Sequence, residues 1–474
     1  MNNRVSLTNI CSFALLIFLI FCQFAMLSGQ VADKGDALIG DEGYYVAKAA
    51  YLVQHGVLPK VEKGLEKSGW TDYRGPGYPV FIALCNMREF DISNVRRRCA
   101  IIQFILMALA LIALYLIAAF AMKGSRWIYL VAFILGIQPW AFDHSASLYA
   151  DSFCTSVTTA SLIFLFMFIR AKRGITELVY LIVSSTLLCL AFMIRTEMLI
   201  LAPAIAATAL IIKFMKDRRI FKYALISGLV FFCFFGIQIG YRYYLTGRPE
   251  LVPKYRFNYV GAWNWAQTWF NTGKFAGEGF AFGSAEKKME NLPAYAFGDD
   301  FEKKEIARAL SVYKVSGHTE EVDAIFQNVA DKRVRDNFFV NCMLTRIWRS
   351  ANLWLNLETN AQFLNALSSV PHPIRRPILA GFLLLKMLIY LLAAASLFAL
   401  IKHSRNKSLN SYHYLTMLAM ANVILITVFI GLIVGSNEYR QVLKAWPAML
   451  WCAISAIIDL SEKNKHPAQF WRRG

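Results

Sequence analysis

Long apolar blocks with almost no charge recur along this chain of 474 residues and constrain its fold more than any other feature. A block of about 20 apolar residues is long enough to cross a bilayer as a helix. We predict spans at roughly 8–28, 99–122, 126–142, 152–169, 177–194, 196–214, 221–241, 377–401, 412–434 and 441–459. The fold class that follows is an all-α polytopic membrane protein with about ten transmembrane helices.

The basic residues indicate how these spans are oriented. The net charge is +19, and most Lys and Arg residues lie in short connections between apolar blocks. The connections on one side contain Arg4, Lys123, Arg126, Arg170, Lys172, Arg173, Lys213, Lys216, Arg218, Arg219, Lys222, Lys402, Arg405, Lys407, Lys463, Lys465, Arg472 and Arg473. This side and both termini are predicted to be cytoplasmic, because basic loops are retained inside. The same charges favour anionic membrane lipids as partners, and no nucleic acid is needed to explain them.

Two long segments remain on the opposite, extracytoplasmic side. One is the first outer loop, 29–98, and the other, 242–376, is too long to be a simple connector. The chain therefore divides into an N-terminal transmembrane module (1–241), an extracytoplasmic domain (242–376) and a C-terminal transmembrane module with a cytoplasmic tail (377–474). The polar chemistry of the chain is expected on the outer face.

The outer domain, between the seventh and eighth spans, is predicted to be mainly helical. Segments 301–315 and 320–356 place charged and apolar residues at three- and four-residue spacing. Trp263, Trp265 and Trp269 lie close together, and tryptophan is enriched where a membrane meets water. We interpret them as an interfacial belt, with an aromatic surface for sugars as the alternative.

The first outer loop contains "GDEGYYVAKAAYLVQHG" (40–56), in which apolar residues recur at helical spacing from Val46 to Val53. A short interfacial helix is predicted here, with Asp41 and Glu42 at its start. Acids at this position cap a helix and suit the positive end of its dipole. They are also two carboxylates held at the membrane surface, where they could take part in chemistry. The two interpretations are compatible.

More polar residues follow on the same face. In "YRGPGYPVFIAL" (73–84), Arg74 either marks a re-entry turn or binds a lipid-linked phosphate. The connection "DHSASLYAD" contains Asp143, His144 and Asp151, and Asp151 begins the next span, so it can cap that helix. Acids this close to a membrane are costly unless paired or hydrated, which makes Asp143 a candidate functional residue.

Two outer turns contain further arginines. "MIRTEML" places Arg195 two residues before Glu197, so Arg195 either pairs with that acid or binds a phosphate or a sugar. "GSNEYR" ends at Arg440, which either contacts a phosphate or anchors the start of the last span.

Three of these motifs together resemble a known family. "GDEGYYVAKAAYLVQHG" is similar to a "DE-x-x-Y-x-x-x-A" first loop, "YRGPGYPVFIAL" to a "K/P-P-G-Y-P" segment, and "NEYRQVLKAWPAMLW" to a late "E-R-Y…P" turn. In this order and on one face they resemble the GT-C superfamily of integral-membrane glycosyltransferases, near its protein O-mannosyltransferase and lipid A aminoarabinose transferase branch. The resemblance covers the N-terminal third well and the rest loosely, so the outer domain leaves the acceptor open.

The resemblance implies an inverting transfer from a polyprenyl-phosphate sugar donor to a glycan, lipid or protein acceptor, at the outer face of a bacterial inner membrane. It implies a catalytic acid in the first loop, and the candidate catalytic residues are Asp41, Glu42 and Asp143. The candidate substrate-binding residues are Arg74, Tyr78, Asp151, Arg195 and Arg440. A divalent cation, Mg²⁺ or Mn²⁺, would bind Asp41, Asp143 and His144.

The residue types suit that chemistry. A carboxylate accepts the proton of the attacking hydroxyl, and positive charge stabilises the departing phosphate. Two other functions remain open, a transporter or flippase of lipid-linked sugars and a non-catalytic assembly protein. A transporter needs charge inside its spans, and Lys386 is the main example in this chain.

Overall fold

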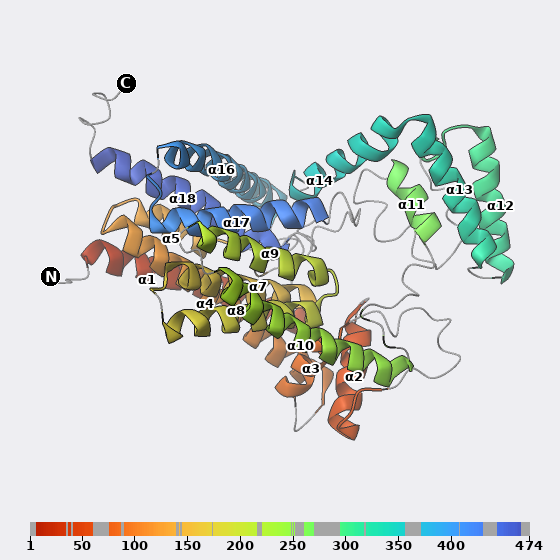
Figure 1. Cartoon of the computed structure of the whole chain (residues 1–474), viewed down its shortest axis with the longest axis horizontal. Helices are drawn as coiled ribbons and strands as arrows, with labels where there is room; N and C mark the ends of the chain where they lie inside the picture. The colour runs from red at the N-terminus through yellow and green to blue at the C-terminus, as the bar shows by residue number, and fades with distance from the viewer. Residues whose placement is uncertain are drawn as a thin grey trace.

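The computed structural model describes most of the chain, and each regular element in the described part is a helix (Figure 1). The described residues are 6–34, 37–38, 41–59, 75–86, 90–138, 142, 145–172, 174–215, 220–247, 249, 251, 260–269, 294–316, 319–355, 371–406, 408–429 and 443–465. The all-α fold class predicted from the sequence is confirmed for these residues.

The apolar blocks form the main bundle. Its helices are α1 (Leu7–Lys34), α4 (Ile92–Met122), α5 (Ile128–Gly136), α7 (Ala150–Arg170), α8 (Ile175–Ile194), α9 (Met198–Phe214), α10 (Ile220–Thr246), α16 (His372–Arg405), α17 (Ser411–Thr427) and α18 (Trp446–Lys465). In the described part, six helices (α1, α4, α7, α8, α10 and α16) are long and apolar enough to cross a membrane. The apolar helices α9 and α17 are shorter. The count of about ten spans stays a prediction.

The outer surface of the bundle is apolar, as a lipid-facing surface should be. Phe21 of α1, Phe232 of α10 and Phe398 of α16 are 66%, 76% and 72% exposed. α7 is the most buried of the long apolar helices. Two of its hydroxyls are satisfied within the helix, because Thr155 and Thr159 each donate to the carbonyl four residues earlier at 2.8 Å. Such bonds let polar residues occupy a buried helix.

The two ends of the bundle differ. The first turn of α1 and the last turn of α18 lie at one end, on the left of Figure 1. The short helices α2 (Asp41–His55) and α3 (Gly77–Cys85) lie at the other end, with a separate helical module beyond it. The first outer loop predicted from the sequence therefore contains short helices, and their location at a membrane interface stays a prediction. Arg96 to Arg98, predicted to end that loop, instead lie inside α4, which begins at Ile92 after its N-cap Asp91.

The helical module consists of α11 (Val260–Trp269), η5 (Ala294–Ala296), α12 (Asp300–Ser316), α13 (Glu320–Asp336), the π-helix η6 (Phe339–Leu344) and α14 (Thr345–Leu355). It has a core of its own, in which Trp265 and Trp269 are 0% and 4% exposed and pack against Phe326 and Ile306. These two tryptophans therefore form a core and no interfacial belt; the side chain of Trp263 lies outside the described residues.

The end of α14 fastens the module to the bundle. The Trp354 indole donates to Thr427 Oγ1 of α17 at 3.0 Å, and the Tyr390 hydroxyl of α16 donates to the Trp354 carbonyl. The Trp354 ring also lies 6.4 Å from the ring of Trp446 in α18. The last three helices of the bundle thus all contact Trp354 of the helical module.

Candidate functional site

A buried ion pair fixes the start of α2. Glu42 is 1% exposed, and its two carboxylate oxygens lie 3.0 and 3.2 Å from the two terminal nitrogens of Arg96 in α4. The backbone amide of Leu148, just before α7, donates to the same carboxylate at 2.9 Å. A two-pronged contact of this kind fixes both the position and the orientation of the carboxylate. Glu42 therefore ties α2 to α4 and to the segment that enters α7.

Asp41 lies beside this anchor and is partly exposed in the first turn of α2. Its neighbour Glu42 is engaged on both oxygens, so the two predicted acids have different surroundings. The structure thus holds one carboxylate inside the protein and presents the other near its surface.

A second chain of charges lies at the same end of the bundle. Arg195, between α8 and α9, pairs with Asp151 in the first turn of α7, and its Nε is 3.7 Å from Glu197. Glu197 Oε1 in turn lies 2.6 Å from Nζ of Lys444, in the short helix η9 (Leu443–Ala445) before α18. Burial raises the pKa of Glu197, but the Lys444 ammonium and the Arg195 guanidinium outweigh this effect and lower it overall. The network therefore alternates in charge.

Tyr78 lies between the two networks. It is 0% exposed, its ring centroid is 4.9 Å from that of Tyr45, and its hydroxyl donates to Gln103 Oε1 at 3.4 Å. Burial, followed by nearby ionisable groups that include Glu42, raises the pKa of Tyr78 well above its ordinary value. This phenol, which the family resemblance implies in substrate binding, is fully enclosed in this structure.

The glycines of "RGPGYP" explain how α3 reaches this position. A Cβ atom on Gly75 would lie 2.0 Å from the carbonyl oxygen of Met193, and one on Gly77 would lie 2.9 Å from the Met193 carbonyl carbon. Atoms cannot approach this closely, so only glycine lets α3 start against the last turn of α8. This contact lies two residues before Arg195.

The structure brings together Asp41, Glu42, Tyr78, Asp151 and Arg195 from the predicted set. Arg74, Asp143, His144 and Arg440 lie outside the described residues. The predicted pair of Arg195 and Glu197 is present, although Arg195 makes its closer contact with Asp151. Asp151 does not cap α7, whose N-cap is Tyr149.

Three members of the networks, Arg96, Glu197 and Lys444, lie outside the predicted site residues, although Glu197 was predicted as a partner of Arg195. Arg96 falls within the predicted loop 29–98, although it shares a buried helix face with Cys99 and Gln103, three and seven residues later. That spacing was the available signal, because a charge on the buried face of a helix requires a partner. Lys444 lies near the start of the predicted span 441–459, where a lysine is also typical of an ordinary span end, and its partner Glu197 is far away in the chain.

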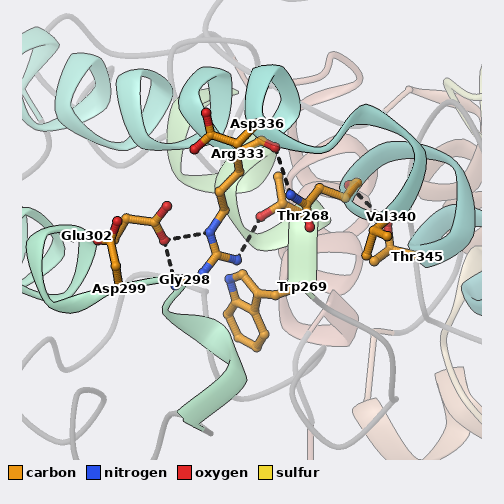
Figure 2. Close-up of a pocket in the computed structure, with 10 residues that line it drawn as sticks. Thr268, Trp269, Gly298, Asp299, Glu302, Arg333, Asp336, Val340 and Thr345 are labelled. Carbon is orange, nitrogen blue, oxygen red and sulfur yellow. Dashed lines mark hydrogen bonds and ion pairs between the residues drawn. The ribbon is translucent and has the colours of Figure 1, made fainter.

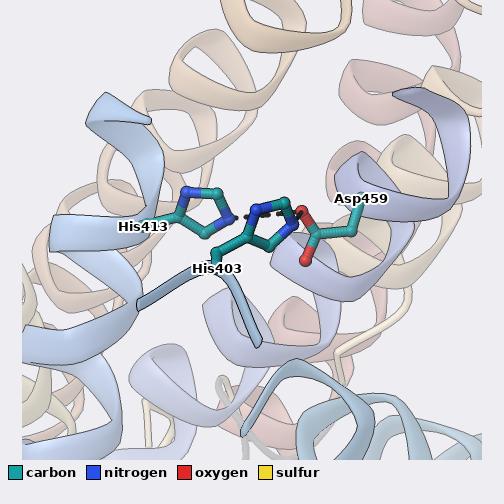
Figure 3. Close-up of side chains that lie close together, drawn as sticks. All are labelled: His403, His413 and Asp459. Carbon is teal, nitrogen blue, oxygen red and sulfur yellow. Dashed lines mark hydrogen bonds and ion pairs between the residues drawn. The ribbon is translucent and has the colours of Figure 1, made fainter. Parts of the chain in front are cut away.

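The predicted divalent-cation site is only partly within the described residues. Asp41 is described, whereas Asp143 and His144 are not, and the nearby carboxylates of Glu42 and Asp151 are each engaged by an arginine. Oxygen ligands suit Mg²⁺ or Mn²⁺, so Asp41 fits such an ion as one ligand. Among the described residues, three potential metal ligands meet within 4.8 Å of one another at His403, His413 and Asp459, near the other end of the bundle (Figure 3).

The helical module contains a polar cavity of about 410 Å³ (Figure 2). Arg333 lies at its wall and donates to Glu302 at 2.7 Å, to Thr268 at 3.2 Å and to the Ala296 carbonyl at 2.7 Å. Asp299 and Asp336 also line the cavity. Because Arg333 already has three partners, its main effect is to hold α11, α12 and α13 together.

Comparison with protein-family models and with curated proteins finds no match. Among solved structures, the chain is similar to the oligosaccharyltransferase AglB of Archaeoglobus fulgidus in complex with an inhibitory peptide and a dolichol-phosphate, at 12% identity and a TM-score of 0.48, over 98% of this chain and 51% of that one. It is also similar to ArnT of Cupriavidus metallidurans bound to undecaprenyl phosphate, at 12% identity and a TM-score of 0.35, over 96% of this chain and 77% of that one. The chain spans about half the length of the archaeal protein.

Proposed function

We propose that this protein is a GT-C-type glycosyltransferase that moves a sugar from a polyprenyl-phosphate donor to an acceptor hydroxyl at the extracytoplasmic face of its membrane. One observation carries the proposal. Asp41 is partly exposed at the start of α2, and the adjacent Glu42 is locked by Arg96 and by the Leu148 amide. The contacts of Glu42 therefore hold the backbone of Asp41 in place, and a general base needs such a fixed position.

In the proposed reaction, Asp41 accepts the proton of the acceptor hydroxyl while the hydroxyl oxygen attacks the anomeric carbon. The bond between that carbon and the phosphate oxygen breaks, and the donor leaves as polyprenyl phosphate. A single displacement inverts the anomeric carbon. The leaving phosphate needs positive charge nearby, and we assign this role to Arg74 and Arg440, which adjoin α3 and η9 in sequence.

The buried residues act by positioning. Glu42 holds the first turn of α2, and Asp151, Arg195 and Glu197 hold the helix ends that surround it. Asp143 and His144 precede this network in the chain and complete the proposed cation site with Asp41. Bound there, Mg²⁺ or Mn²⁺ would supply further positive charge for the phosphate.

We further propose that the protein lies in a bacterial inner membrane, with both termini in the cytoplasm and the Asp41 site outside. The end of the bundle that carries α2 is opposite to the end with the basic C-terminal turn of α16. This arrangement agrees with the positive-inside rule. Dolichyl and undecaprenyl phosphate sugars are the first donors to test.

The decisive variant is Asp41→Asn, which keeps the size of the side chain and removes the base. We expect its glycan product, measured in cells that lack the chromosomal copy, to fall by about 10²–10⁴-fold. Glu321→Gln removes an exposed carboxylate on the helical module and serves as the matched control, with wild-type output expected.

Membrane abundance of each variant is measured by immunoblotting, so that a loss of protein is not read as a loss of chemistry. Unchanged glycan output in Asp41→Asn, at wild-type abundance, would contradict the role of Asp41. Movement of the lipid-linked sugar across proteoliposomes without transfer would favour the flippase, and neither activity would favour an assembly protein.

A further inference from the structure

Three side chains from three helices converge near the end of the bundle opposite to Asp41 (Figure 3). His403 belongs to the last turn of α16, His413 to the first turn of α17 and Asp459 to α18. Asp459 Oδ1 lies 3.3 Å from Nε2 of His413 and 3.7 Å from Nε2 of His403. The side chains of His413 and Asp459 are 1% and 5% exposed, and that of His403 is 26% exposed.

The groups around the cluster orient these atoms. Nδ1 of His403 is 2.9 Å from the Ser408 hydroxyl, which leaves Nε2 directed at the other two side chains. The Tyr412 hydroxyl donates to Asp459 Oδ1 at 2.7 Å. The other carboxylate oxygen, Asp459 Oδ2, is buried and has no hydrogen-bond partner among the described residues. A buried carboxylate oxygen without a partner is costly and is often explained by an ion or a water molecule.

We propose that His403, His413 and Asp459 bind a divalent transition-metal ion, with zinc as the best fit. Two imidazole nitrogens and a carboxylate oxygen are a common donor set for zinc, with water as a fourth ligand. Ligand atoms about 2.0–2.1 Å from a tetrahedral zinc lie roughly 3.3–3.4 Å from one another. Asp459 Oδ1 lies 3.3 and 3.7 Å from the two ring nitrogens, and the three ligand atoms all lie within 4.8 Å of one another, so the side chains must draw together to accept the ion.

Metal binding has a consequence at the start of α17. In this structure the Asn410 amide donates to Nδ1 of His413 at 2.8 Å, so the ring proton is on Nε2 and faces Asp459. An ion on Nε2 moves that proton to Nδ1, and the amide of Asn410 then loses its acceptor. The metal thus replaces the contact between His413 and Asp459 and removes one of the two hydrogen bonds of the capping box at Asn410, while the Asn410 side chain still accepts from the backbone of α17.

The ion would join α16, α17 and α18, the same three helices that contact Trp354 at the other end of the bundle. Its role is structural, and it does not depend on the proposed glycosyl transfer. A zinc site that joins three helices raises stability, because the folded state binds the ion more tightly than the unfolded chain.

The test uses the full chain, purified in detergent and stripped of metal with a chelator. Zinc is added during thermal unfolding, and cobalt is titrated as a spectroscopic substitute. We expect one ion per chain, a higher unfolding temperature, a tetrahedral cobalt absorption band and faster amide exchange at Asn410. In His403→Ala the affinity for zinc should fall by more than about 100-fold. Loss of a direct ligand weakens metal binding more than loss of a residue that only hydrogen-bonds to a ligand.

His403→Ala is suited to this test because His403 is partly exposed and its removal leaves the bundle core intact. Its unfolding temperature without metal should match that of the stripped wild-type protein. His55→Ala, at an exposed histidine on α2, is the matched control and should keep the wild-type affinity. Absence of saturable zinc binding in the wild-type protein, or equal affinity in His403→Ala, would overturn the proposal.

Discussion

The pair of Glu42 and Arg96 shows how one contact separates two adjacent acids. Both charges are nearly completely buried, and desolvation offsets much of their attraction. What the pair supplies is position, because the guanidinium engages both carboxylate oxygens. The backbone of Asp41, one residue earlier, is therefore fixed as well, and its side chain is more exposed than that of Glu42.

Removal of one partner should therefore cost more than removal of both. Arg96→Met leaves the Glu42 carboxylate buried without its cation, and we expect the free energy of unfolding to fall by about 3–5 kcal/mol. The double variant Glu42→Gln with Arg96→Met should recover part of this loss. Thermal unfolding in detergent measures both, and a double variant less stable than Arg96→Met would contradict the argument.

At the scale of elements, the contact between α3 and α8 decides where the polar helix ends meet. Gly75 and Gly77 let the start of α3 lie against the Met193 carbonyl group, and Arg195 follows directly after that turn. The Gly-Pro-Gly sequence therefore has a steric function, in addition to the turn that its composition predicts.

Gly75→Ala should displace this contact. Its Cβ would meet the Met193 carbonyl oxygen, and we expect a loss of about 1–3 kcal/mol in the free energy of unfolding, with reduced glycan output. Gly43→Ala, in α2, is the control, since its Cβ would meet nothing within 4 Å and should stabilise the helix by about 1 kcal/mol. Equal stability of the two variants would refute the steric explanation.

At the scale of the whole molecule, the pair of Glu197 and Lys444 joins residues far apart in the chain. It connects the turn between α8 and α9 to the entry of α18. The last helix is thereby linked to the network that contains Asp151 and Arg195. The N-terminal and C-terminal halves of the bundle meet at the proposed site.

This link should make stability sensitive to acid. The pKa of Glu197, which precedes the first residue of α9, is below its ordinary value of 4.5 in the folded protein, so its contribution is complete above that value. The contribution is lost as the pH falls below 4.5 and through the lower folded pKa. Unfolding temperatures of the wild-type protein and Glu197→Gln should differ at neutral pH and converge in acid. A constant difference across that range would show that Glu197 does not titrate in this way.

The sequence by itself determined the helical class and the approximate positions of the helices in the bundle. Apolar blocks are a local property, and a bilayer accepts them only as structures that satisfy their own backbone. The predicted spans 152–169 and 177–194, for example, correspond to α7 and α8 within two residues at each end. The motif around Asp41 is also visible in the sequence, because its residues are neighbours in the chain.

Only the tertiary structure decided which polar groups meet. Arg96 engages Glu42 and leaves Asp41 more exposed, and Asp459 joins His403 and His413 from another helix. Neither contact follows from spacing, since each depends on how separate helices pack and rotate against one another. Buried charge must find a partner, but the sequence does not say which one.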